Sequence, residues 1–166
     1  MKTRSQCIIK SFLLITLFIT FKASAQTANF SGNWKIDTTR TNFNGAPIFV
    51  LPKALRVSET AAGLIIDRTM IGGQEEKHYT EQMTFDGKSS QAITSSGNTE
   101  TDTLSHSADK TGLIIHMGVK SPDGKLLIIV TENWSLSDNG NTLIDDRQVQ
   151  QYDGSKYEIK GYYTKQ

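Results

Sequence analysis

The chain has 166 residues and a formal net charge of +1, with 37% hydrophobic residues and a single cysteine. Four of its eighteen basic residues, and none of its acids, lie in residues 1–25, so residues 26–166 hold 14 basic and 17 acidic groups and a formal charge of −3. That balance excludes the basic composition expected of a nucleic-acid binder, and a lone cysteine excludes an internal disulfide.

Residues 1–25 have the layout of a secretory signal peptide. A basic start precedes an apolar run from Phe12 to Phe21, and Ala23-Ser24-Ala25 then precedes Gln26. An apolar run of about ten residues is too short to span a bilayer. We expect cleavage after Ala25 and a single domain over residues 26–166 that is secreted or periplasmic and does not span the membrane. Because Cys7 precedes the apolar run, we expect no lipid anchor.

From residue 30 onward, short runs alternate between apolar and polar residues, and turn dipeptides separate the runs. Pairs such as Asp123-Gly124 and Asn139-Gly140 suit hairpin turns, because Gly, Asn and Asp tolerate the positive φ that these turns require. No stretch has a convincing helical period. The pattern predicts strands near residues 30–37, 53–59, 63–70, 76–85, 88–95, 99–107, 112–120, 125–137, 141–151 and 155–164.

A hairpin pattern occurs three times along the chain. The three copies align over residues 55–66, 104–115 and 134–145, and their starts are 49 and then 30 positions apart. Unequal spacing argues against a solenoid. The copies instead favour an all-β fold, an antiparallel up-and-down meander of about eight to ten strands that closes into a barrel and so removes its edges.

Residues that lie opposite each other in a hairpin point to the same side of the sheet. Pairing Val57 with Leu64 in the first copy makes one face apolar, as a barrel interior requires. The equivalent pair in the second copy is His106 with Leu113. The inward face of the second hairpin is therefore expected to include a histidine.

In the third copy, the same pairing places Trp134 opposite Asp145 and Glu132 opposite Arg147 on the inward face. Buried charges are costly unless they are paired or hydrated, so these residues predict either a compensated ion pair or a solvent-filled cavity. At the last turn, a three-residue loop sets Val149 opposite Ile159 and turns two tyrosines inward, whereas a two-residue loop turns them outward. The two tyrosines are Tyr157 and Tyr163.

This inward cluster is the candidate ligand site. Arg147 is expected to bind a ligand carboxylate or phosphate, with Trp134 and the tyrosines as flat apolar walls. The alternative is that the Glu132–Arg147 pair plugs one end of the barrel without a ligand. The candidate ligand-binding residues are His106, Glu132, Trp134, Asp145, Arg147, Tyr157 and Tyr163.

The segment Phe30-Ser-Gly-Asn-Trp-Lys35 resembles the opening Gly-x-Trp motif of lipocalins and lipocalin-like barrels. The late segment Trp134-Ser-Leu-Ser-Asp-Asn-Gly140 is similar to one in small secreted bacterial proteins of lipocalin-like type. The resemblance implies that Gly32 and Trp34 close one barrel end, beneath a basic residue of a late strand. Lys160 or Arg147 is expected to supply that basic residue.

Residues 42–52 interrupt the alternation and hold two of the three prolines. An apolar run between Pro47 and Pro52 is unsuited to a central strand. In a lipocalin-like barrel, a long loop lies over the open mouth at this place, so we expect Ile48, Phe49 and Leu51 to line a ligand entrance. The alternative is a loop that packs on the outer wall or plugs the barrel end.

The sequence holds no recognisable catalytic motif, no dinucleotide or phosphate fingerprint, and no metal-ligand spacing. Of the three histidines, His106 is expected to point inward and His78 and His116 outward, so they are not expected to share one metal. We therefore expect no catalytic residue and no cofactor. The predicted function is the binding of a small hydrophobic or amphiphilic ligand inside the barrel. The alternative is a ligand-free structural or adaptor domain of the cell envelope that binds a protein partner through its outer face.

Overall fold

The computed structural model describes residues 28–72 and 75–166, which form ten strands and two short 3₁₀ turns. The predicted signal peptide lies outside the described residues. The strands agree closely with the predicted ranges. Their bounds are β1 Gly32–Ile36, β2 Ala54–Glu59, β3 Gly63–Gly72, β4 Glu75–Thr84, β5 Ser90–Ile93, β6 Thr99–His106, β7 Leu113–Lys120, β8 Leu126–Ser137, β9 Thr142–Gln151 and β10 Lys156–Lys165, with turns η1 Ile48–Val50 and η2 Asp138–Gly140.

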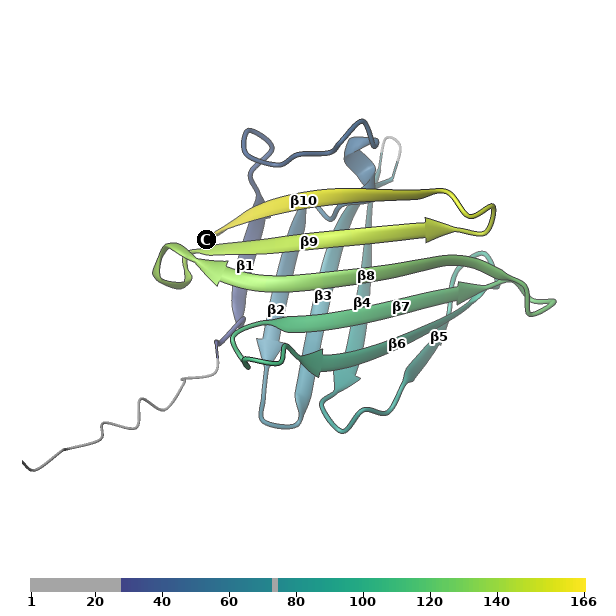
Figure 1. Ribbon diagram of the computed structural model, residues 1–166, viewed down its shortest axis with the longest axis horizontal. Helices are drawn as coiled ribbons and strands as arrows, with labels where there is room; N and C mark the ends of the chain where they lie inside the picture. Colours follow the sequence, from purple (N-terminus) through teal and green to yellow (C-terminus); the bar gives the residue numbers. More distant parts are fainter. Residues whose placement is uncertain (1–27, 73–74) are drawn as a thin grey trace, which may run out of the picture.

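All ten strands belong to one antiparallel sheet in the order β4-β3-β2-β1-β10-β9-β8-β7-β6-β5. Successive strands pair as a meander, and β1 pairs with β10, so the sheet curls back on itself. Figure 1 shows β7 to β10 crossing in front of β1 to β4, as two walls of a barrel. Over the described residues the two outer strands, β4 and β5, approach each other without a backbone ladder. The all-β, up-and-down barrel prediction is confirmed, with the barrel nearly closed.

The turns follow the glycine signals in the sequence. Gly124 and Gly154 have φ of +83° and +85°, values that glycine adopts at no steric cost. Each turn closes with a backbone hydrogen bond from the glycine N–H to the carbonyl of the residue three positions earlier, at 2.8 Å in the first and 3.0 Å in the second. These short turns fix the order and direction of the last four strands.

The predicted register is confirmed in two hairpins, where His106 pairs with Leu113 and Glu132 with Arg147. It is wrong by two residues in the first hairpin, where Val57 pairs with Ile66. The turn is centred one residue later than expected, at Ala61-Ala62, and is closed by the Thr60 N–H donating to the Gly63 carbonyl at 2.9 Å. A slip of two residues keeps each side chain on its predicted face, because strand side chains alternate with a period of two.

A second register difference occurs in the last hairpin, where Val149 pairs with Tyr157 and not with Ile159. The turn is centred one residue earlier than expected, at Asp153, and is closed by the Gln151 N–H donating to the Ser155 carbonyl at 2.9 Å. The inward face is again unchanged, with Ile159 and Tyr163 buried and Tyr157 half-buried. The tyrosines therefore lie on the predicted side of the sheet.

One end of the barrel is closed by aromatic residues. The Trp34 indole N–H donates to the Phe30 carbonyl at 2.9 Å. The ring centroids of Trp134 and Phe30 are 6.2 Å apart. The ammonium of Lys165 lies 5.1 Å from the Trp34 ring centroid, so Lys165 takes the role expected of Lys160 or Arg147. The core of this end contains Phe30, Trp34, Leu55, Val57, Leu64, Ile66, Met83, Leu104, Leu113, Ile115, Trp134, Leu143 and Tyr163.

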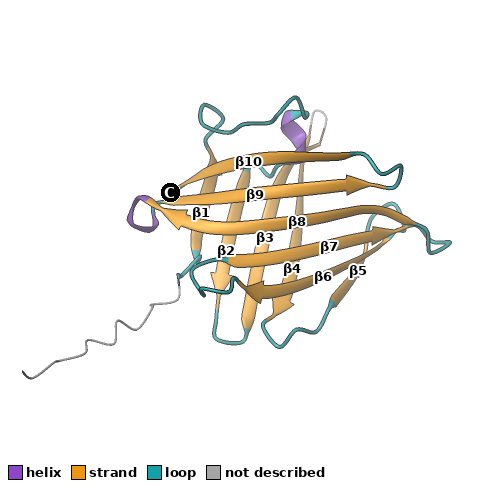
Figure 2. Ribbon diagram, viewed as in Figure 1, coloured by secondary structure: helices purple, strands orange, loops and turns teal. Residues whose placement is uncertain are grey.

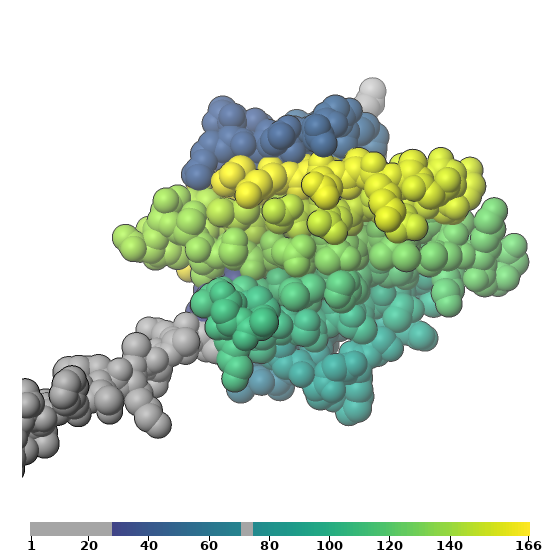
Figure 3. All heavy atoms as spheres, viewed as in Figure 1, coloured from purple at the N-terminus to yellow at the C-terminus, as the bar shows by residue number. Residues whose placement is uncertain are grey.

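The loop between β1 and β2 covers part of the opposite end and contains η1, drawn in purple in Figure 2. It packs against β10, where Asn42 and Lys160 exchange two backbone hydrogen bonds, and the space-filling view shows the contact (Figure 3). Leu51 is 1% exposed, whereas Ile48 and Phe49 are 50% and 55% exposed. Within residues 28–72 and 75–166, no helix is long and apolar enough to cross a membrane.

Candidate functional site

A layer of charged side chains crosses the barrel interior above the aromatic core. Arg68 of β3 donates through Nε to Glu81 of β4 at 3.0 Å and through Nη2 to Glu132 of β8 at 3.0 Å. Arg147 of β9 donates through Nη2 to the other oxygen of Glu132. One carboxylate therefore joins two arginines, and the network links strands on both walls.

The guanidinium of Arg147 is occupied on its other sides as well. Its Nη1 donates to the Val50 carbonyl at 2.8 Å, and its Nε lies 3.4 Å from Asp145. The first contact ties η1 to the interior of the barrel. The Nη1 and Nη2 of Arg147 therefore donate to Val50 and Glu132, while Nε faces Asp145 without a hydrogen bond. Arg147 does not present the free pair of Nη donors that the sequence suggested for a ligand carboxylate or phosphate.

The network holds Glu132 ionised. Burial opposes ionisation of Glu132, but Arg147 and Arg68 outweigh it and lower the pKa of this carboxyl. The opposite holds for Asp145, where burial and then the charge of Glu132 raise the pKa. Arg68 also lies 5.8 Å from the Trp134 ring centroid, which places this cation between carboxylates and an aromatic face.

Asp102 of β6 lies beside this network without belonging to an ion pair. Its burial, with the charges of Glu100 and Glu81, raises the pKa of the Asp102 carboxyl to about 7. Burial raises the pKa of Glu81 too, against the opposing effect of Arg68. The side of the layer nearest β4 and β6 is thus short of positive charge.

Above the charged layer, toward the end where η1 lies, several inward apolar side chains are only partly buried. Met117 pairs with Asp102, and Val119 pairs with Ile128, all on the inward face. Met117, Val119 and Ile128 are half-buried, whereas Ile115, two residues closer to the closed end, is fully buried. These inward side chains are therefore less covered than those at the opposite end, and we call this end of the barrel the open end.

Two further inward side chains of the open end come from β3 and β4. Met70 is half-buried, and Tyr79, which pairs with Arg68, is 38% exposed. Burial raises the pKa of Tyr79 to about 12, against the opposing effect of Arg68, so its hydroxyl stays protonated and available as a hydrogen-bond donor. The open end thus combines apolar walls with polar groups at its base.

The structure brings most of the sequence-predicted site residues into one interior, but not all of them. Trp134, Asp145 and Tyr163 are buried close to the Glu132–Arg147 pair, and Tyr163 has its pKa raised well above normal by burial and Asp145. Tyr157 lies farther toward the open end, opposite Val149. His106 is separate from them all.

His106 lies at the closed end, where its ring stacks on Phe85 with centroids 4.2 Å apart. It is the last residue of β6, two pairs beyond Leu104 toward the turn that joins β6 to β7. The pairing with Leu113 was predicted correctly, but the distance along the strand separates His106 from the charged layer. Its neighbours give it a packing role.

Three residues of the charged layer were missed by the sequence reasoning: Arg68, Glu81 and Asp102. The alternation that places Leu64 and Ile66 inward continues to Arg68, and the same alternation from Met83 reaches Glu81. Continuing the period of two past the apolar residues is the signal that identifies them. A charged residue in a strand is otherwise taken as part of the solvated face.

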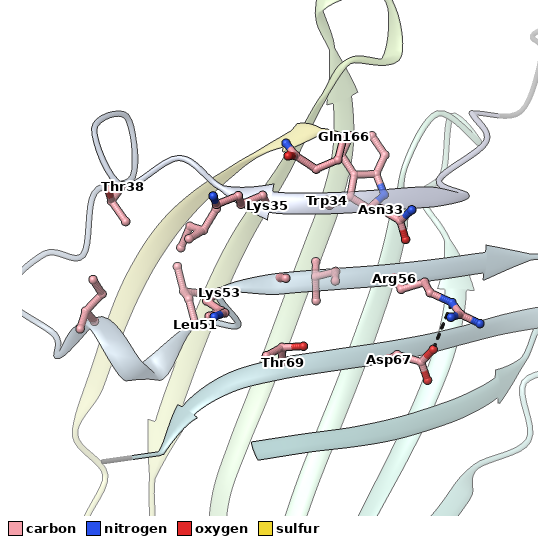
Figure 4. A pocket seen from close by; sticks show the side chains of 14 residues that line it. Asn33, Trp34, Lys35, Thr38, Leu51, Lys53, Arg56, Asp67, Thr69 and Gln166 are labelled. Atoms are coloured by element: carbon pink, nitrogen blue, oxygen red, sulfur yellow. Dashed lines mark ion pairs between the residues drawn. The ribbon is translucent and has the colours of Figure 1, made fainter. Parts of the chain in front are cut away.

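The outer wall carries a separate groove of about 620 Å³ over β1, β2 and β3 (Figure 4). Its side chains include Lys35, Lys53, Arg56, Asp67 and Thr69, with Ile48 at one edge. Arg56 lies 3.5 Å from Asp67, and Lys53 pairs with Glu76. Much of the charge along this groove is therefore already paired on the protein surface.

No family model matches the chain, and no curated protein matches it either. The ten-stranded antiparallel barrel is compatible with a lipocalin-like fold. Among the residues that the structure describes, no group of three or more His, Cys, Asp or Glu side chains is arranged to hold a metal ion. A β-barrel of this kind is compatible with ligand binding.

Proposed function

We propose that this protein binds a small amphiphilic molecule in the open end of its barrel and thereby carries it or sequesters it from water. The observation that supports this is a contrast within single strands. On β7 the inward residues change from buried Ile115 to half-buried Met117 and Val119, directly above buried polar groups. Apolar side chains left partly exposed inside a barrel gain about 25 cal/mol per Å² when a ligand covers them.

The base of this space adds a polar requirement. Glu81 Oε1, Asp102 Oδ1 and Arg68 Nη1 are buried and have no hydrogen-bond partner within the protein. Buried polar atoms are normally satisfied, so such atoms at the base of an open interior indicate water or the polar end of a ligand. A ligand with one polar end matches both the base and the walls.

The proposal is tested by titrating the protein with a neutral apolar dye, N-phenyl-1-naphthylamine, and following its fluorescence. Ile128→Glu places a charge on the inward wall, and we expect it to weaken dye binding by at least about tenfold, or about 1.4 kcal/mol. Ile129→Glu is the matched control, because Ile129 is the next residue of β8 and points outward. If both variants bind the dye as the wild type does, the open end is not the binding site.

The alternative, an adaptor domain that binds a protein through its outer face, is favoured by the groove over β1 to β3. In that groove Lys53 and Arg56 already pair with acids of the same wall. The interior offers buried groups without partners, and the groove offers mostly paired ones. A protein that binds no dye and yields no small molecule on denaturing extraction supports the adaptor alternative.

We further propose that the chain is exported and cleaved after Ala25, so that the barrel acts outside the cytoplasm. The basic start, short apolar run and Ala23-Ser24-Ala25 support this. N-terminal sequencing of the protein from each cell fraction tests it. We expect Gln26 as the first residue of the exported form, and a full-length chain retained in the cytoplasm contradicts it.

A further inference from the structure

The charged layer contains more acids than bases. Its two arginines face four buried carboxyl groups, so two negative charges remain if every group is ionised. Three of the acids, Glu81, Glu132 and Asp145, lie within ion-pair distance of an arginine. The four acids are Glu81, Asp102, Glu132 and Asp145, and the two bases are Arg68 and Arg147.

The fourth acid, Asp102, is 3% exposed and accounts for one of these two charges. Over residues 28–72 and 75–166, no basic side chain lies within ion-pair distance of Asp102, and its Oδ1 has no hydrogen-bond partner. Glu81 faces the same side of the interior and also has an oxygen, Oε1, without a partner. A buried carboxylate without a counter-ion is costly, so this place favours a positive charge.

The two carboxyls sit on strands that meet at the seam of the barrel. Glu81 belongs to β4 and Asp102 to β6, and these strands approach each other although no ladder joins them over the described residues. Asp102 pairs with Met117 across the β6–β7 ladder, and Glu100 pairs with Val119. The acidic base and the apolar wall are therefore adjacent within a single pair of strands.

We propose that the ligand is an amphiphilic amine, whose ammonium group lies beside Asp102 and Glu81 and whose apolar body covers Met117 and Val119; this inference rests on the proposed function. An ammonium group donates up to three hydrogen bonds and accepts none, which matches two carboxylate oxygens that lack donors. It also supplies the positive charge that this side of the layer lacks.

Other head groups fit the base less well. The Nη1 and Nη2 donors of Arg147 are directed to Val50 and Glu132, so an anionic head group finds no free pair of donors there; only Nε, 3.4 Å from Asp145, lacks a hydrogen-bond partner. Arg68 Nη1 lacks a partner, but the same guanidinium already binds two carboxylates, which neutralise its charge.

The test compares three molecules with the same tail, octylammonium, 1-octanol and octanoate, as competitors of the bound naphthylamine dye. We expect octylammonium to bind about tenfold tighter than 1-octanol, since one charge-assisted pair contributes about 1.5–3 kcal/mol, and octanoate to bind weakest. Asp102→Asn should reduce the advantage of octylammonium over 1-octanol to about twofold or less. Asp146→Asn is the control, because Asp146 is an outward acid on β9 that pairs loosely with Lys160 at 3.9 Å.

The outcomes separate the two proposals. If 1-octanol or octanoate binds as tightly as octylammonium, or if Asp102→Asn keeps the full preference for the amine, the amine inference is overturned while binding in the open end stands. If none of the three displaces the dye and the dye does not bind, the proposed function itself is overturned. Should Asp102→Asn fail to give the wild-type circular dichroism spectrum, Glu81→Gln replaces it with the same expected loss of preference.

Discussion

Arg68 and Glu132 form an ion pair of 3.0 Å across the barrel interior, although they are 64 positions apart in the chain and lie on β3 and β8. Both side chains are 1% exposed. The pair links the two walls of the barrel at a level where apolar packing gives way to charge. Its strength depends on complete pairing, because a buried charge that loses its partner is destabilising.

Replacing Glu132 by Gln tests this dependence. The variant leaves Arg68 and Arg147 facing each other without the carboxylate that joins them, and we expect it to lower the free energy of unfolding by about 3–5 kcal/mol. Urea unfolding followed by tryptophan fluorescence measures the change. The matched control is Asp146→Asn, because Asp146 precedes Arg147 on β9 and points outward. Its exposed pair with Lys160 contributes less than about 1 kcal/mol to stability. Equal effects of the two substitutions contradict a structural role for the buried network.

The sequence was sufficient for the strands and for most of the inward face. Alternation and the Asn139-Gly140 turn predicted the pairing of Glu132 with Arg147, because a short glycine turn leaves one register in which the apolar faces agree. The same reasoning misplaced Val57 by two residues without changing its face. Period-two patterns specify faces more strongly than they specify exact partners.

Alternation and turn signals in the sequence did not predict the path of the β1–β2 loop. The contact of Arg147 with the Val50 carbonyl joins residues 97 positions apart, and nothing local in either segment specifies it. Ile48, Phe49 and Leu51 were grouped as an entrance, yet the structure separates buried Leu51 from the two exposed residues. Loop conformation depends on where the rest of the barrel offers partners, which a one-dimensional pattern does not contain.

The buried carboxyl of Asp102 predicts an unusual pH dependence of stability. Burial, then Glu100 and Glu81, raise its pKa to about 7 in the folded protein, against the opposing effect of Arg68 on β3. The folded state therefore holds a proton that the unfolded state has released between about pH 4 and pH 7. The contribution of this carboxyl to the free energy of unfolding is fully present below about pH 4 and is lost as the pH rises through about 7.

The variant Asp102→Asn removes that titration. A difference of one in a pKa corresponds to about 1.4 kcal/mol. The free energy of unfolding of the variant, relative to that of the wild type, should therefore rise by at least about 1.4 kcal/mol between about pH 5 and pH 8. Urea unfolding of both proteins at the two pH values gives the comparison. A constant difference across that range means that Asp102 titrates normally, and its burial is then compensated in some other way.

Gly32 is required by the closed end of the barrel. Its φ is +148°, and a Cβ at this position would lie 2.7 Å from Cε of Lys165, whose side chain crosses over Trp34. We expect Gly32→Ala to lower stability by about 1–3 kcal/mol through backbone strain and the displaced lysine. Thermal unfolding measures the loss. Adding Lys165→Ala to Gly32→Ala should restore only the part of the lost stability that is due to the contact with Lys165, because the strained φ remains. Full recovery of stability would show that the backbone at this position tolerates alanine.

The loop at the open end offers a paired test of which apolar side chains support the fold. Leu51 is 1% exposed and packs toward Gly161, where its Cδ1 would be 3.0 Å from an added Cβ, whereas Phe49 is 55% exposed in the same loop. We expect Leu51→Ala to cost about 2–5 kcal/mol and Phe49→Ala less than about 0.5 kcal/mol. Urea unfolding of the two variants under one set of conditions provides the measurement. The reverse order of effects would show that the loop is anchored through its exposed turn, and that Leu51 does not hold it against the barrel.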